Sequence, residues 1–275
     1  MGHDAHSPGA PASGVLPGTV LPAFALLLLA GSYVALSRRA RRCNPVQGWS
    51  PWRTACFLAG AALLAVALLP PVAAYAHHDF RGHMAQHMLI GMYAPLALVL
   101  GAPVTLLLRT LPTAHGRRLT RVLHSRPARV ATRPAVALLL SAGTLVALYV
   151  TPLYNTAMGH PAGHWLMNAH FLLAGLLFAH VMAGPDPAPS RPGVRVRLVC
   201  LGVAIAVHAV LSQMIYGGFW TDVHAPVDQV RGGAELMYYG GDIAELLLAA
   251  ALVATWRPTP RARPRGSGAA RRVPA

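Results

Sequence analysis

The sequence predicts an all-α, polytopic membrane protein: a seven-transmembrane-helix bundle with its N-terminus outside and its C-terminus in the cytoplasm. The chain of 275 residues is 55% hydrophobic and only 11% charged, whereas about 25% of a soluble domain is charged. Its apolar residues form stretches close to 20 residues long, the length at which a helix crosses a hydrocarbon core of about 30 Å. Its arginines cluster in alternate gaps between these stretches.

Seven apolar stretches predict the spans, at residues 16–36, 54–75, 84–108, 134–151, 164–182, 197–215 and 234–256. Together they form one transmembrane domain, residues 16–256. We expect residues 1–15 to be a flexible extracytoplasmic segment and residues 257–275 to be a disordered basic tail in the cytoplasm. The first 18 residues contain no Arg. They therefore lack the basic region of a signal peptide, and we expect no cleavage.

The orientation follows from the arginines. Twenty-one of the 23 follow the first, third, fifth or seventh stretch, and only Arg81 and Arg231 lie in the other gaps. Cytoplasmic loops of membrane proteins are enriched in Arg and Lys. The N-terminus is therefore expected outside, and an odd number of spans places the C-terminus inside. We expect a multi-pass protein of the cell (plasma) membrane.

The formal charge of +15 does not predict a nucleic-acid partner. All 23 basic residues are Arg and they flank apolar stretches, so their natural surroundings are the lipid bilayer and its headgroups. Cys43, Cys56 and Cys200 form no CxxC motif. The predicted topology puts them on the reducing side of the membrane, where we expect neither a disulfide nor a cysteine-based metal relay.

Histidines in the non-cytoplasmic half of the bundle are candidate metal ligands. Ionisable residues inside spans are costly and usually face the bundle interior. Five such histidines come from three predicted spans: His83, His87, His164, His170 and His208. His83 and His87 are four residues apart, so they share one helix face. Met84 and Met88 follow them, and thioether plus imidazole ligands favour copper, especially Cu(I).

Two acidic residues of the last span could assist that site. Asp242 and Glu245 are three residues apart and share a face. They could balance the charge of a bound cation or accept hydrogen bonds from the histidine ligands. They could equally serve as polar contacts between helices. The outer group His77, His78 and Asp79 could capture metal or be merely solvated.

Four pieces of the sequence, in order, resemble the CtaG family of cytochrome c oxidase assembly proteins, which are associated with caa-type oxidases. The resemblance covers roughly residues 60–250. The pieces are HMAQHMLIGMYAPLALVLGAPVTLLLR from His83, HWLMNAHFLLAGLLFAHVMAGPDPAPSR from His164, HAVLSQMIYGG from His208 and DQVRGGAELMYYGGDIAE from Asp228.

The resemblance implies a non-enzymatic role in the biogenesis of a haem-copper oxidase. The expected partner is a subunit of that oxidase, to which the protein would deliver copper. One departure is visible. Many family members carry a Trp-His pair near the outer end of the fourth span, where this chain reads Leu148 to Pro152 without a histidine. The site is therefore either reduced or completed by another residue, such as His160.

Three other functions remain open at this point. The chain could be a scaffold without metal, its histidines making internal hydrogen bonds. It could be a b-type cytochrome, with haem between histidines of two helices. It could be a multi-histidine membrane metalloenzyme, although Gln86 stands within the HxxxH motif and no HExxH is present.

Overall fold

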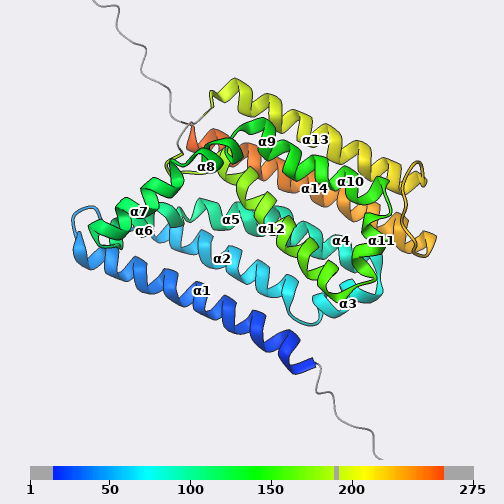
Figure 1. The fold of residues 1–275 in the computed structure, drawn as a ribbon, viewed down its shortest axis with the longest axis horizontal. Coiled ribbons are helices and arrows are strands. Elements are labelled where there is room, and N and C mark those ends of the chain that lie inside the picture. The colour runs from blue at the N-terminus through cyan, green and yellow to red at the C-terminus, as the bar shows by residue number, and fades with distance from the viewer. Residues whose placement is uncertain (1–14, 189–191, 257–275) are drawn as a thin grey trace, which may run out of the picture.

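The computed structural model describes residues 15–188 and 192–256, and this part of the chain is helical with no β-strand. Residues 1–14 of the predicted N-terminal segment and the whole predicted tail, residues 257–275, lie outside the described residues. The helices run roughly along the long axis of the molecule (Figure 1). In chain order they are α1 Val15–Cys43, α2 Pro51–Leu68, α3 Val72–His78, α4 Phe80–Met88, η1 Leu89–Tyr93, α5 Ala94–Leu100, α6 Pro103–Thr110, α7 Thr113–Leu123, α8 Arg126–Ala131, α9 Pro134–Leu138, η2 Leu139–Gly143, α10 Thr144–Val150, α11 Leu153–Met158, α12 Pro161–Ala183, α13 Val194–Gly217 and α14 Val227–Thr255.

Among the described residues, six helices are long and apolar enough to cross a membrane. They are Thr19–Cys43, Pro51–Leu68, Phe80–Thr110, Ala162–Ala183, Val194–Gly217 and Val227–Thr255. The remaining predicted span, residues 134–151, forms the apolar helix Pro134–Val150, which is shorter than the 18 residues that the other six reach. A multi-pass membrane protein is therefore supported, while the count of seven crossings stays a prediction.

Four helix boundaries differ from the predicted spans by four residues or more. The first helix continues to Cys43 rather than ending at 36. The second span was expected at 54–75, but α2 ends at Leu68, because Pro70 and Pro71 follow and cannot continue a hydrogen-bonded helix. Residues up to 75 belong instead to the short helix α3. The third span begins at Phe80 rather than 84, and the last begins at Val227 rather than 234.

The third span changes its winding along its length. Five residues, Leu89–Tyr93, form a π-helical turn between α4 and α5. Pro95 follows, and a proline inside a helix has no N–H and clashes with the carbonyl four residues earlier, here that of Gly91. The helix stops after Leu100, and Ala102 adopts a left-handed conformation (φ 51°) before Pro103 starts α6.

The third span lies at the centre of the bundle. α4 packs on α14, α5 packs on α2, and η1 packs on α12, while α13 covers the other side of α14. α1 lies at the periphery against α2 and α6. Side chains on its surface face outward: Leu21 is 71% exposed and Leu27 is 72% exposed. Exposed leucines of this kind suit a lipid environment.

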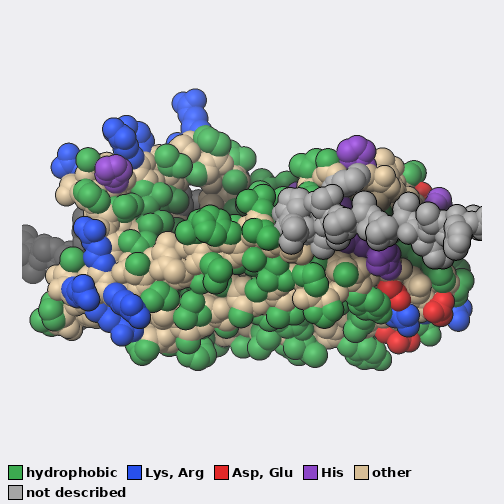
Figure 2. Space-filling model, turned by 90° about the horizontal axis from the view of Figure 1, so that it is seen from below, with side chains coloured by type: hydrophobic (Ala, Val, Ile, Leu, Met, Phe, Trp, Pro, Cys, Tyr) green, Lys and Arg blue, Asp and Glu red, His purple; other side chains and the backbone are tan. Residues whose placement is uncertain are grey.

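Charged side chains gather at the two ends of the molecule, and hydrophobic side chains cover the length between them (Figure 2). Arginines mark one end, where α6, α7 and α8 lie; we call it the basic end. Acidic residues and histidines mark the other, where α3 and α11 lie; we call it the acidic end. The charge asymmetry predicted from the sequence is thus present in three dimensions.

Candidate metal site between the helices

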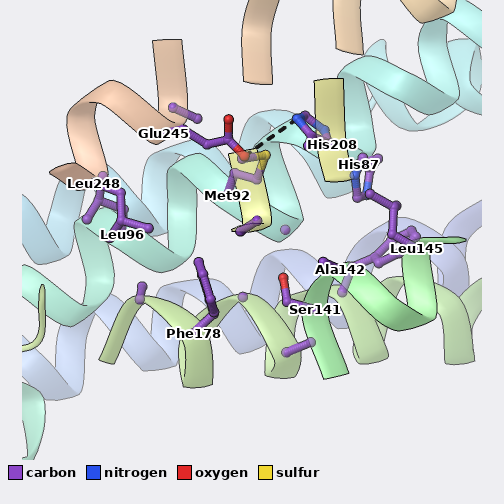
Figure 3. Close-up of a pocket in the computed structure, with 17 residues that line it drawn as sticks. His87, Met92, Leu96, Ser141, Ala142, Leu145, Phe178, His208, Glu245 and Leu248 are labelled. Atoms are coloured by element: carbon purple, nitrogen blue, oxygen red, sulfur yellow. Dashed lines mark ion pairs between the residues drawn. The ribbon is translucent and has the colours of Figure 1, made fainter. Parts of the chain in front are cut away.

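A cavity of about 70 Å³ lies inside the bundle, between η1, α5, η2, α12, α13 and α14. Most of its wall is apolar. The polar groups on it are the imidazoles of His87 and His208, the carboxylate of Glu245, the hydroxyl of Ser141 and the thioether of Met92. Figure 3 shows these side chains arranged around the space. We call this group the central site.

His87 reaches the cavity from the last turn of α4. Its side chain is buried, and its ring packs edge-on against Phe171, with 4.3 Å between the ring centroids. Neither Nδ1 nor Nε2 has a hydrogen-bond partner among the described residues. A buried polar atom left without a partner costs about 1–3 kcal/mol. Burial of the His87 ring therefore destabilises the fold unless a bound group in the cavity contacts its nitrogens.

His208 and Glu245 face each other from α13 and α14. Their Nδ1 and Oε1 atoms are 3.8 Å apart, within ion-pair range but beyond a hydrogen bond (Figure 3). Nε2 of His208 and Oε2 of Glu245 have no partner within the described chain. The ring fits there because residue 241 is glycine: a Cβ atom at that position would overlap it.

Met92 and Ser141 belong to the central site and were missed by the sequence analysis. Met92 lies five residues after His87, which is off its face in a regular α-helix. The π-turn of η1 closes hydrogen bonds between residues five apart, and so it brings the two to one side. Ser141 comes from the second π-turn, η2, and points toward the cavity (Figure 3). The only sequence clue to either turn is Pro95.

His83 lies one turn nearer the acidic end and is fully buried. Its Nε2 is 2.9 Å from the hydroxyl of Tyr149, and that hydroxyl lies 3.7 Å from the sulfur of Met84. A tyrosine has a single hydroxyl proton. When it points to the sulfur, Nε2 of His83 must donate, and Nδ1 keeps a free lone pair. Nδ1 has no partner among the described atoms.

Two other aromatic side chains enclose His83. Tyr154 of α11 packs on its ring at 4.9 Å and Phe80 at 5.9 Å, both measured between centroids. Burial raises the pKa of the Tyr154 phenol, which therefore stays protonated at neutral pH. The side chains of Tyr154 and Phe80 that enclose His83 are therefore uncharged.

His164, in the first turns of α12, forms an outer pair with His77 of α3. Their ring centroids are 4.2 Å apart. Nε2 of His164 is 3.4 Å from the side-chain nitrogen of Asn168. Both histidines line a surface cleft of about 350 Å³ at the acidic end. The pair is thus accessible from outside the bundle, whereas His83 is not.

The other predicted residues lie elsewhere. Nε2 of His170 contacts the hydroxyl of Thr144 at 2.8 Å and the carbonyl of Leu140 at 3.2 Å. Met84 and Met88 pack where glycines of α14 leave room, Met84 beside Gly233 and Met88 beside Gly240. None of these predicted residues lines the central cavity, nor does Asp242, which is half-buried on α14.

The predicted site is thus divided into a central group, His87, His208 and Glu245, and an outer group, His83 and His164. No three His, Cys, Asp or Glu side chains in residues 15–188 and 192–256 are arranged to hold a metal ion together. Any shared ion would need a thioether, a water or a side-chain movement. Metal binding by these residues stays a prediction.

The missing histidine of the fourth span has a structural counterpart. Tyr149 occupies that region and bonds His83. His160 does not replace it: its ring accepts the backbone N–H of Ala162 at 3.2 Å and so begins α12, and its side chain is exposed.

Comparison with known proteins gives one family. The sequence profile described as cytochrome c oxidase caa3 assembly factor matches residues 31–259. No solved structure shows significant similarity.

Three curated mycobacterial proteins, all described as uncharacterized, are similar to the chain. Those of Mycobacterium bovis and Mycobacterium tuberculosis are 33% identical over 247 residues, which is 82% of this chain and 36% of theirs. That of Mycobacterium leprae is 32% identical over 250 residues, 84% of this chain and 38% of its own. The chain therefore spans little more than a third of these relatives.

Proposed function

Because this chain belongs to the family of cytochrome c oxidase caa3 assembly factors, we propose that it holds a copper ion between its helices and passes it to a subunit of a haem-copper oxidase. The copper is cargo rather than a catalytic group, so the role is not enzymatic. The cargo is taken up at the acidic end, which faces the outside of the cell membrane, and the arginines of the basic end lie in the cytoplasm.

The observation that supports this proposal best is the set of four unpartnered polar atoms at the central site. They are both ring nitrogens of His87, Nε2 of His208 and Oε2 of Glu245. Buried polar groups are nearly always paired, and exceptions call for an explanation. A cation bound by the imidazoles and balanced by the carboxylate satisfies all of them except one nitrogen of His87.

The chemistry of the donors suits a soft ion held loosely. Two imidazoles and the nearby thioether of Met92 are ligands that copper, and Cu(I) in particular, accepts. A carboxylate beside a monovalent cation gives a neutral pair, which reduces the cost of placing either charge inside a membrane. Few protein ligands leave the ion exchangeable, as transfer to a partner requires.

The remaining predicted ligands take supporting positions in this proposal. His83 and His164 lie between the central site and the acidic end. Met84 and Met88 act as packing residues beside α14, and Asp242 adds negative charge near Glu245. His170 orients α10 against α12 through Thr144.

The alternatives fit the central cavity less well. A space of about 70 Å³ accommodates two or three waters, at about 30 Å³ each, and is far too small for a haem or an organic substrate. In a scaffold without metal, water alone would have to satisfy these atoms, and the mostly apolar wall of the cavity offers such waters few other partners. This scaffold is the alternative that the following experiment separates from copper handling.

The test is Cu(I) binding by the purified protein under reducing conditions. We expect the wild type to bind copper, and His87→Ala/His208→Ala to lose one equivalent. His124→Ala changes an exposed histidine at the basic end and is the matched control. Unchanged stoichiometry and affinity in the double variant would reject the central site. A wild type that binds no copper, with oxidase activity still dependent on the chain, would establish the scaffold.

A further inference from the structure

A row of imidazoles connects the surface of the acidic end with the central site. It begins at His77 and continues through His164, His83 and His87 to His208. Four of these residues belong to the predicted site, whereas His77 comes from the outer loop helix α3 and lies on the surface. The row crosses four helices, so no sequence periodicity produces it.

Each neighbouring pair in the row is close. The rings of His77 and His164 lie 4.2 Å apart. His87 and His208 line the same cavity. Asn168 lies 3.4 Å from His164 and 3.4 Å from Gln86, which is on α4 three residues after His83. His83 and His87 also share a face of α4, one turn apart. Neighbouring imidazoles of the row are thus linked by a ring contact, by a shared helix face or by a shared cavity, and His164 is linked to α4 through Asn168.

Several ring nitrogens along the row have no hydrogen-bond partner within the described chain, so they are available as ligands for a cation that moves along it. Nδ1 of His83 and both nitrogens of His87 are buried without partners among the described residues. Tyr149 holds His83 by its other nitrogen, and ligand histidines are commonly held in this way. Met84 cannot replace His83 as a step, because its sulfur faces Tyr149.

The outer end of the row opens to water. His77 lines two surface clefts, one shared with His164 and Asn168, the other with His78, Asp79 and His224. Burial increases from the exposed His77 to His164 and His83, which are 6% and 1% exposed, and His87 and His208 are buried as well, each 5% exposed.

We propose that His77 and His164 form an outer capture site for Cu(I), from which the ion reaches the central site by ligand exchange through His83. This inference rests on the proposed copper-handling function. No bond other than metal–ligand bonds is made or broken, and the ion keeps its oxidation state. At each step one imidazole is released as the next one binds.

The test is the rate of Cu(I) uptake from a chromogenic Cu(I) chelator, followed by stopped flow, together with the final copper content. We expect His77→Ala to slow Cu(I) uptake about tenfold, because His164 is then the only imidazole left at the outer capture site. The final content should not change, because the central site is intact. His78→Ala is the matched control, since His78 is adjacent and exposed but outside the row.

The outcomes separate the route from the function. Equal rates for wild type, His77→Ala and His164→Ala would overturn the route while leaving copper binding intact. A wild type without copper uptake would overturn both. Loss of final copper content in His77→Ala would also contradict the proposal, because it would make His77 part of the resting site. His77 is exposed, so its variant tests the route even if His164→Ala does not fold.

Discussion

Two carboxylates are buried to almost the same extent but have different surroundings. Asp186, at the basic end, is 2% exposed, and Glu245, at the central site, is 4% exposed. Asp186 accepts the backbone N–H groups of Val104 and Thr105 at 3.0 and 2.8 Å and also the hydroxyl of Thr105. Glu245 has His208 at 3.8 Å, and its second oxygen has no partner in the described chain.

The difference separates a structural carboxylate from one available for binding. Asp186 neutralises the free N–H groups at the start of α6, where a helix carries partial positive charge. It joins the loop after α12 to the end of the third span. Within residues 15–188 and 192–256, Glu245 accepts no backbone N–H and connects no loop. Its burial is explained if it meets a bound cation or if the carboxyl is itself protonated and neutral.

The largest effect on stability is expected from Asp186→Ala. It removes the acceptor for three hydrogen bonds to a buried charge and exposes unpaired N–H groups of α6. We expect a loss of about 3 kcal/mol in unfolding free energy, measured by thermal or denaturant unfolding in detergent. Copper content per folded molecule should not change. A stable Asp186→Ala protein would abolish the contrast between the two carboxylates.

Glu245→Gln should show the opposite behaviour. The amide keeps the shape but removes a buried charge, so stability should stay equal to that of the wild type or rise slightly. Cu(I) affinity should fall by about 10- to 100-fold, the range found when groups supporting a metal site are lost. Competition with a Cu(I) chelator measures it. Unchanged affinity together with lower stability would make Glu245 structural, like Asp186.

The sequence predicts the membrane-spanning helices better than it predicts the breaks and π-turns within them. Six of the seven predicted stretches form long apolar helices, since length and composition determine whether a helix can cross the membrane. The errors lie where proline acts. Pro70 and Pro71 end α2 early, and Pro95 accompanies a π-turn whose position depends on packing against α12. Helix pairing is also tertiary information that hydropathy does not contain.

Prediction of the site is limited by side-chain rotation. His83 and His87 share a face, as their spacing predicts, yet only His87 lines the central cavity. His170 has the right depth but turns to Thr144 and Leu140. Met92 was missed because the π-turn changes the register. The sequence analysis left His77 open as a metal-capturing or solvated residue, because its contact with His164 depends on how α3 packs. The depth of a residue along its helix can be predicted from the sequence, whereas the direction in which its side chain points depends on how the helices pack.

A third carboxylate extends the comparison to a partnered but less buried case. Asp79 accepts the backbone N–H of Arg81 at 2.8 Å at the start of α4 and pairs with its guanidinium, with 2.6 Å between Oδ2 and Nη2. Hydrogen bonds from the Arg81 side chain hold the pKa of Asp79 below its usual range. The pair therefore stabilises the fold above the ordinary carboxyl pKa, and this contribution is lost as the pH falls through the lowered value.

The smallest effect is expected from Asp79→Asn, because Asn still accepts the N–H at the start of α4 and only the ion pair is lost. At neutral pH its unfolding midpoint should be lower than that of the wild type by about 2 °C. The difference in unfolding midpoint should disappear in acid, because the wild-type carboxyl is then protonated and, like Asn, carries no charge. Midpoints compared from neutral to acidic pH measure it. A difference that persists in acid would show that Asp79 acts through shape rather than charge, and burial would then distinguish the three carboxylates better than their partners do.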